Sequence, residues 1–241
     1  MRGCAALTRR ADGPPEVRDD SAGRVESAAC ETHLQPARKR VHYAVSQFVS
    51  WFLFVLVFGF RSFGRLRLPS HGGCIIACSH QSFLDPIIVG FSCRRAVRYL
   101  ARGSLFRSRL FGAFIASYGA MQVERDEADV GAVRQCIEHL HRGEMVLLFP
   151  EGTRTRTGEI GPLKPGVCLI SSRAGVPVVP AAVEGSLAAW PRGRLLPMPR
   201  KIRIAYGEPV MPGGEGVSHR ETAERLRAKM KELQARIARV G

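Results

Sequence analysis

Acidic residues are scarce in this chain of 241 residues. Its 21 aspartates and glutamates are outnumbered by 36 lysines and arginines, which gives a formal net charge of +15. A surface of this charge favours phosphate-rich partners, namely nucleic acids, anionic lipid headgroups or phosphorylated small molecules. Aromatic residues amount to only 7%, and neither zinc-finger spacing nor an aromatic RNA-binding sequence occurs. These absences argue against nucleic acid and leave the phosphates of lipids or small molecules.

The chain also lacks an apolar run of the roughly 20 residues that a membrane-spanning helix requires. Its densest apolar stretch, residues 48–60, is shorter, and basic residues flank it on both sides. We therefore predict that residues 38–67 form a membrane-associating helical segment, a monotopic or re-entrant anchor whose arginines meet an anionic membrane surface. A single span and a buried core helix are the alternatives.

Paired cysteine spacing is absent as well. The seven cysteines are odd in number, which favours reduced thiols in the cytosol over a disulfide framework. Cys74 and Cys78 fall on one face of a predicted strand, where buried free thiols are common. A metal site built from these two residues and His80 would need a second ligand pair, so we predict no metal. We expect the folded domain on the cytoplasmic face of the cell membrane.

The chain divides into a tail, the anchor segment and one larger domain. Residues 1–37 have little apolar periodicity and no signal-peptide pattern, so we predict a disordered tail. From residue 68 to 241 short apolar runs alternate with helical ones, as in an α/β domain. The predicted strands are 74–78, 145–149, 176–183 and 202–206, with a further strand region over 111–123; the predicted helices are 86–93, 130–140 and 167–174.

A longer helix is predicted for residues 218–240. It begins with a capping box at Ser218–Glu221 and continues with apolar residues at helical spacing. The rest of this helix is rich in arginine and lysine. We expect it to pack on the core with a solvated outer face; contact with a membrane surface is the alternative.

His80 lies five residues before Asp85, directly after the apolar run Cys74–Cys78. Histidine suits general-base chemistry near neutral pH, and a carboxylate that orients the ring raises its basicity. Five residues of a regular helix turn through about 500°, which separates the two side chains. The pair can meet only across a strand-to-helix turn, with Asp85 at the N-cap and Pro86 at the first helical position. The spacing alone also fits a simple helix cap beside an incidental histidine.

A second polar cluster follows the predicted strand 145–149, at a position where α/β proteins bind ligands. Gly152 lets the backbone turn after Glu151, and Thr153 offers a hydroxyl. Arg154 presents the planar fork that binds phosphate through two hydrogen bonds, and Lys164 adds a cation. These residues predict a phosphate-binding loop, with an ordinary solvated loop as the alternative.

Two further stretches are less specific. Arg125 follows a predicted strand, and taken alone it fits a surface ion pair as well as a ligand contact. Residues 176–180 contain two prolines, which suggests an edge strand or a strand that bounds a groove, because proline lacks a ladder donor. Val176, Pro177 and Val178 are candidates for lining an acyl groove, and ordinary core packing is the default account of them.

Together and in this order, these stretches resemble the glycerolipid acyltransferase family, the lysophosphatidic acid acyltransferases in particular. His80 and Asp85 match the family's HxxxxD motif, and residues 151–154 match the EGTR form of its third block. Gly119 with Arg125 matches the second block, and residues 176–180 match the fourth. The similarity runs from about residue 48 to 210. One departure is Ser79, where the family often carries asparagine.

The resemblance implies a single α/β domain with a mixed sheet flanked by helices. It implies an enzyme that moves a fatty acyl group from a thioester to the free hydroxyl of 1-acylglycerol-3-phosphate, giving phosphatidic acid. His80 would take the proton from that hydroxyl, and Asp85 would hold the imidazole and stabilise its cation. Arg154 would bind the acceptor phosphate, supported by Arg125 and Lys164.

The same resemblance gives Glu151 the task of positioning glycerol oxygens, and it implies no cofactor. The acyl donor would be acyl-CoA or acyl carrier protein. Alternatives are another acceptor, such as glycerol-3-phosphate, another lysophospholipid or an amino-lipid, and a non-catalytic basic lipid-binding protein. Mere binding would not need His80. A serine hydrolase is disfavoured because no GxSxG sequence occurs.

Overall fold

The computed structural model describes residues 48, 52, 54–117, 119–123, 130–211 and 218–240, all of which belong to the unit from Val41 to Gly241. Three sequence predictions therefore lie wholly or mostly outside the described residues. They are the disordered tail 1–37, the first part of the membrane-associating segment 38–67, and the ligand contact of Arg125.

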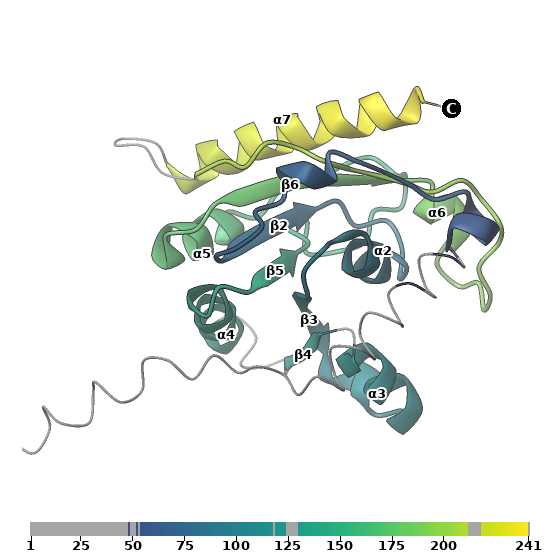
Figure 1. The fold of residues 1–241 in the computed structure, drawn as a ribbon, viewed down its shortest axis with the longest axis horizontal. Helices are drawn as coiled ribbons and strands as arrows, with labels where there is room; N and C mark the ends of the chain where they lie inside the picture. The colour runs from purple at the N-terminus through teal and green to yellow at the C-terminus, as the bar shows by residue number, and fades with distance from the viewer. Residues whose placement is uncertain are drawn as a thin grey trace, which may run out of the picture. The chain divides into compact units, whose positions relative to one another are not determined.

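A mixed sheet organises the described part of the chain (Figure 1). Its seven strands are β1 (Arg61–Phe63), β2 (Cys74–Cys78), β3 (Val97–Arg102), β4 (Ala120–Val123), β5 (Met145–Leu148), β6 (Val178–Glu184) and β7 (Arg203–Tyr206). They lie in the order β1-β7-β6-β2-β5-β3-β4, and all neighbours run parallel except the antiparallel pair β6 and β7. The prediction of an α/β domain with a mixed sheet is confirmed.

Helices cover both faces of this sheet. Every residue of the central strand β2 is buried, and its side chains alternate between two cores because successive strand residues point to opposite faces. Cys74, Ile76 and Cys78 belong to the core under α2 (Asp85–Ser92). Ile75 and Ala77 belong to the core under α4 (Val130–His141), α5 (Gly166–Ala174) and α7 (His219–Ala238).

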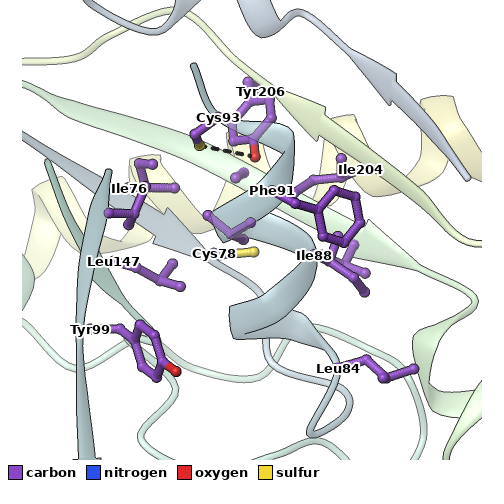
Figure 2. Packing of buried hydrophobic residues seen from close by; sticks show 14 of the residues in the cluster. Ile76, Cys78, Leu84, Ile88, Phe91, Cys93, Tyr99, Leu147, Ile204 and Tyr206 are labelled. Carbon is purple, nitrogen blue, oxygen red and sulfur yellow. Dashed lines mark hydrogen bonds between the residues drawn. The ribbon is translucent and has the colours of Figure 1, made fainter. Parts of the chain in front are cut away.

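The core under α2 is shown in Figure 2, where Phe91 of the helix lies beside Ile204 of β7, and where Ile76 and Cys78 of β2 belong to the same cluster. At the far end of the helix, the hydroxyl of Tyr206 lies 3.6 Å from Cys93 Sγ. This packing fixes α2 on the sheet and, with it, the position of Asp85 at the first turn of the helix. The remaining helices are η1 (Arg65–Arg67), η2 (Gly103–Phe106), α3 (Arg109–Ser117) and α6 (Ser186–Ala189).

The sequence missed two strands and mistook one helix. The predicted strand region over 111–123 contains β4, but residues 111–117 are helical in α3. A short apolar run has no periodicity that separates a strand from a buried helix. The edge strand β1 has only three residues, and β3 carries an arginine at each end of its apolar centre. Neither strand has the apolar run that identified β2 and β5.

The prediction of an edge position for residues 176–180 is wrong, because β6 lies between β2 and β7. Pro180 is tolerated there because the nitrogen and carbonyl of a strand residue point to the same side. Its carbonyl accepts from Gly207 N at 2.8 Å, so its missing N–H faces a point where β7 has already ended and the ladder loses no bond. A Cβ atom on Gly207 would come within 2.8 Å of the Pro180 ring. Glycine at 207 therefore makes room for proline inside the sheet.

The described residues of the anchor segment divide between two environments. Residues 54–58 are helical, and Phe54 and Phe58 pack in the core with Phe60 and Phe91. Phe52 and Leu56 are exposed. The residues that follow, 61–67, join the sheet through β1 and continue into η1, so the α/β domain begins before residue 68. Within the described ranges, no helix combines the length and apolarity needed to cross a bilayer.

The C-terminal helix α7 follows the sequence prediction closely. The Ser218 hydroxyl accepts from Glu221 N at 3.1 Å, as a capping box requires. Leu226 and Met230 are buried in the core that α7 shares with the sheet and α5, and Ile237 is buried as well. The helix packs on the core with its charged face outward.

Candidate active site

The candidate site lies where three parallel central strands end. His80 follows β2, Glu151 follows β5, and Ser186 follows β6. The carboxyl ends of neighbouring parallel strands meet at one edge of a sheet, where open α/β folds bind ligands. Residues more than 100 positions apart in the chain thereby come into hydrogen-bonding contact.

The predicted pair of His80 and Asp85 is formed. His80 Nδ1 lies 2.9 Å from Asp85 Oδ2. A carboxylate only accepts hydrogen bonds, so Nδ1 carries the proton and Nε2 keeps the lone pair. This tautomer places an unprotonated nitrogen opposite the carboxylate, which is the arrangement of a general base.

Asp85 is completely buried, and its charge is stabilised by hydrogen bonds from four donors. Oδ2 accepts from the backbone N–H groups of Gln81 at 2.6 Å and Ser82 at 2.7 Å, in addition to the imidazole. Oδ1 accepts from the Ser186 hydroxyl at 2.6 Å. Buried carboxylates persist as ions only with such compensation. The turn 80–85 therefore wraps around the carboxylate and orients it toward His80.

The predicted helix cap is wrong in detail. Helix α2 begins at Asp85, with Leu84 in the N-cap position and no side-chain cap. The carboxylate points back to the preceding turn and accepts hydrogen bonds from its N–H groups. It does not point forward to the first turn of the helix. Pro86 is the second helical residue. Asp85 serves the histidine loop and not the helix terminus.

Three contacts fix His80 from the side of β5. Its ring stacks on Phe149, with centroids 3.9 Å apart and planes inclined by 19°. Its backbone N–H donates to Glu151 Oε1 at 3.0 Å, and its carbonyl accepts from Thr155 N at 2.8 Å. The imidazole is thus held between the carboxylate of Asp85 and an aromatic face, with little freedom to rotate.

Glu151 itself is occupied by backbone groups. Its second oxygen accepts from Gly161 N at 3.0 Å. The carboxylate therefore links the loop 150–161 to the histidine loop. The role of positioning glycerol oxygens stays a prediction.

The predicted phosphate-binding residues gather beside this carboxylate. Gly152 adopts a φ of 71°, and a Cβ atom there would meet the side chain of Lys164 at 2.9 Å. The guanidinium of Arg154 lies 3.6 Å above the ring of Phe83, a cation–π contact that orients its plane. Arg192 donates to the Arg154 carbonyl at 2.6 Å and to the Thr153 hydroxyl at 3.3 Å. Glycine at 152 thus lets Lys164 cross the loop, and cations concentrate next to His80.

The acyl-groove candidates lie elsewhere. Val176 and Val178 are buried in the core under α5 and α7, and Val178 pairs with Ile75 near the start of β2. His80 follows the other end of that strand. The structure therefore does not bring Val176, Pro177 and Val178 to the site, and the default reading of core packing holds for the two valines.

The cysteine thiols are not poised for chemistry. All five described cysteines are free and buried. Burial raises the pKa of the Cys74 thiol to about 11, against a smaller opposing effect of Arg95, and burial raises that of Cys93 to about 12. Such thiols stay protonated at neutral pH. Within the described ranges, no three His, Cys, Asp or Glu side chains are grouped to hold a metal ion.

Sequence reasoning missed several residues of the site. Ser186 and Arg192 arrive from the far side of β6, and no local pattern marks them. Gln81 donates to the Gly158 carbonyl at 3.1 Å and its Oε1 accepts from Leu187 N at 3.4 Å, so it joins the same network. The sequence could have marked Phe149 as a site residue, because it directly precedes the Pro-Glu-Gly-Thr-Arg sequence. Ser79, the departure from the family pattern, accepts from Val183 N at 2.9 Å and ties β2 to β6.

Comparisons with known proteins point to one family. The profile of the Acyltransferase family matches residues 60–184. A 1-acyl-sn-glycerol-3-phosphate acyltransferase of Bacillus subtilis is 32% identical over 180 residues, covering 74% of this chain and 86% of the relative. The chloroplastic 1-acyl-sn-glycerol-3-phosphate acyltransferase BAT2 of Brassica napus is 32% identical over 133 residues, but the chain covers only 38% of its length.

A solved structure shares the fold. The crystal structure of PlsC, the 1-acyl-sn-glycerophosphate (LPA) acyltransferase from Thermotoga maritima, matches with a TM-score of 0.70 at 24% identity, over 88% of each chain.

Proposed function

Because the chain belongs to the Acyltransferase family, we propose that it transfers a fatty acyl group from an acyl thioester to the free hydroxyl of 1-acylglycerol-3-phosphate. The product is phosphatidic acid, a precursor in phospholipid synthesis. The observation that carries the proposal is the His80–Asp85 pair, an oriented base beside a cluster of cations. The names of the relatives in Bacillus subtilis and Brassica napus support the choice of acceptor.

In this mechanism the acceptor hydroxyl is itself the nucleophile. His80 Nε2 removes its proton as the oxygen attacks the thioester carbonyl. Asp85 stabilises the imidazolium that forms, as a triad aspartate does. Collapse of the tetrahedral intermediate breaks the carbon–sulfur bond, and the departing thiolate takes the proton back from His80. No protein nucleophile is required, which agrees with the neutral, buried thiols of Cys74 and Cys93.

The acceptor phosphate is assigned to the loop after β5. Arg154 offers a planar fork whose orientation is fixed over Phe83. Lys164 crosses Gly152 beside it. Arg125 is a further candidate from the sequence. Two or three cations are enough to hold a phosphate monoester dianion.

The enzyme acts at a membrane because its substrates carry long acyl chains. The exposed Phe52 and Leu56 support attachment through the N-terminal segment. The high positive charge favours an anionic bilayer surface. We further propose that the domain lies on the cytoplasmic face of the membrane. The proposed acyl donor is acyl-CoA or acyl carrier protein.

The test is thiol release from acyl-CoA in the presence of vesicles that contain lysophosphatidate. Wild type should release thiol and form phosphatidic acid, and His80→Ala should lose at least about 10³-fold in kcat. The matched control is His71→Ala, an exposed histidine bonded to its neighbour Ser70, which should keep full activity. Equal rates for wild type and His80→Ala would refute the assignment, and transfer only to other lysolipids in an acceptor panel would correct the substrate.

A further inference from the structure

Residues 190–201, which connect α6 to β7 and are called the α6–β7 loop below, carry two adjacent leucines in solvent. Leu195 is 91% exposed and Leu196 is 75% exposed. Single exposed leucines are common on protein surfaces, but an adjacent pair at a loop tip is an apolar protrusion. Such a protrusion favours a partner that removes it from water.

The exposure of the leucines is built into the loop. The Met198 N–H donates to the Ala189 carbonyl at 2.7 Å and closes the base of the loop. The indole Nε1 of Trp190 donates to the Arg194 carbonyl at 2.7 Å, immediately before the leucines. These bonds hold the backbone on both sides of the pair, so Leu195 and Leu196 are presented outward by an internally bonded turn.

Cations surround the apolar tip. Arg192 and Arg194 precede the leucines, Arg200 and Lys201 follow them, and all four residues are exposed. Apolar side chains between lysines and arginines match the interface of an anionic bilayer, where the tip reaches the acyl boundary and the cations meet headgroup phosphates.

The α6–β7 loop also adjoins two regions that the proposed function places at a membrane. Ile202 N donates to the Phe58 carbonyl at 3.0 Å, which joins the end of the loop to the helical residues 54–58. Exposed Leu56 lies on that helix, and Figure 1 shows both segments beside α6 at the same end of the sheet. On the other side, Ser82 Oγ donates to the Trp190 carbonyl at 3.0 Å, within the histidine loop.

We propose that the α6–β7 loop is a second membrane contact, which docks Leu195 and Leu196 into an anionic bilayer surface. The inference rests on the proposed function and adds to it the placement of the site. Contacts on both sides of the site set the His80 loop at the interface, so a lysolipid reaches the base while its acyl chain stays in the bilayer. The continuity with Leu56 favours a bilayer over an acidic carrier protein as the occupant.

The test uses the full chain and the double variant Leu195→Ser/Leu196→Ser. Cosedimentation with vesicles of phosphatidylcholine and phosphatidylglycerol should show binding weakened about tenfold. Transfer to vesicle-borne lysophosphatidate should fall in proportion, whereas transfer between a short-chain acyl-CoA and a short-chain, monomeric lysophosphatidate should be unchanged. The matched control is Val130→Ser, a residue 82% exposed at the start of α4, away from α6 in Figure 1. It should bind vesicles as wild type does.

A second variant separates the charge from the apolar tip. Arg200→Gln/Lys201→Gln should weaken binding to anionic vesicles and leave binding to pure phosphatidylcholine vesicles unchanged. Wild-type vesicle binding by the leucine variant would overturn the proposal, as would an equal loss in Val130→Ser. A loss of acyl transfer seen only with acyl carrier protein as donor would also overturn it. So would a wild-type dimer that forms without lipid and that the leucine variant no longer forms. Vesicle binding is measured without turnover, so a failure of acyl transfer to every acceptor would count against the proposed function alone.

Discussion

Glu151 accepts a hydrogen bond from the backbone N–H of His80 at 3.0 Å, although 71 residues separate the two in the chain. Its other oxygen accepts from Gly161 N, so one carboxylate joins the loop after β5 to the loop after β2. The two motifs identified in the sequence are therefore parts of one structure. The HxxxxD motif supplies the base, and the glutamate of the EGTR block holds the backbone of that base in place.

This contact predicts the effect of Glu151→Gln. The amide has one acceptor oxygen, so its NH₂ group must face either the His80 N–H or the Gly161 N–H, and two donors then oppose each other. We expect kcat to fall about 10- to 100-fold because the imidazole is less well held, while the KM for lysophosphatidate stays within about twofold. Steady-state kinetics of the purified variant measure both values.

The matched control is Glu159→Gln, an exposed residue of the same loop, which should match wild type. The role derived from the family resemblance, contact with glycerol oxygens, predicts a different result for Glu151→Gln. A raised KM for the acceptor with an unchanged kcat would favour that role and contradict ours.

Sequence patterns located His80, Asp85 and the loop 151–154 because each belongs to a short stretch with its own chemistry. They could not locate Ser186, whose hydroxyl reaches Asp85 only because β6 and β2 are neighbours. Strand order depends on which long-range pairings bury the most surface, and no local signal records it. The error at residues 176–180 has the same origin. Local composition suggested an edge strand, but the strand lies inside the sheet, where Gly207 leaves space for the Pro180 ring.

Ser186 is predicted to position the catalytic pair. Its hydroxyl donates to Asp85 Oδ1 at 2.6 Å inside the protein. Ser186→Ala removes one of the donors that hold the carboxylate, so we expect kcat to fall about tenfold with little change in either KM. Ser186→Thr, which keeps a hydroxyl, should recover part of the loss.

A buried serine outside the site provides the comparison for Ser186. Ser92 donates to the Val89 carbonyl at the far end of α2. Ser92→Ala should lower the free energy of unfolding by about 1 kcal/mol without changing kcat. If both variants lowered kcat equally, a general loss of stability would explain the result and the positioning role of Ser186 would be lost.

Arg154 and lysine should not be interchangeable at the phosphate loop. Lysine keeps the charge but lacks the planar fork and the stacking that holds Arg154 over Phe83. We expect Arg154→Lys to raise the KM for lysophosphatidate about tenfold while the KM for acyl-CoA is unchanged. Arg156→Lys, an exposed change in the same loop, should be neutral. An effect confined to the acyl-CoA KM would move Arg154 from the acceptor phosphate to the donor.

The pH dependence of stability can be predicted for Glu144, which joins α4 to β3. Partial burial alone would raise its pKa, but hydrogen bonds from Arg98 and His139 outweigh burial and hold the pKa below the ordinary value of 4.5. A carboxylate with a lowered pKa in the folded state stabilises the protein above its unfolded pKa, and this contribution disappears as the pH falls through the folded pKa. Glu144→Gln should therefore cost about 1–2 kcal/mol in the free energy of urea unfolding at about pH 7, and the difference from wild type should shrink steadily below about pH 4.

The control Glu138→Gln breaks only an exposed pair with Arg134 and should cost less than about 0.5 kcal/mol. A cost for Glu144→Gln that is the same at both ends of this pH range would mean that packing, and not the charge of Glu144, holds α4 against β3.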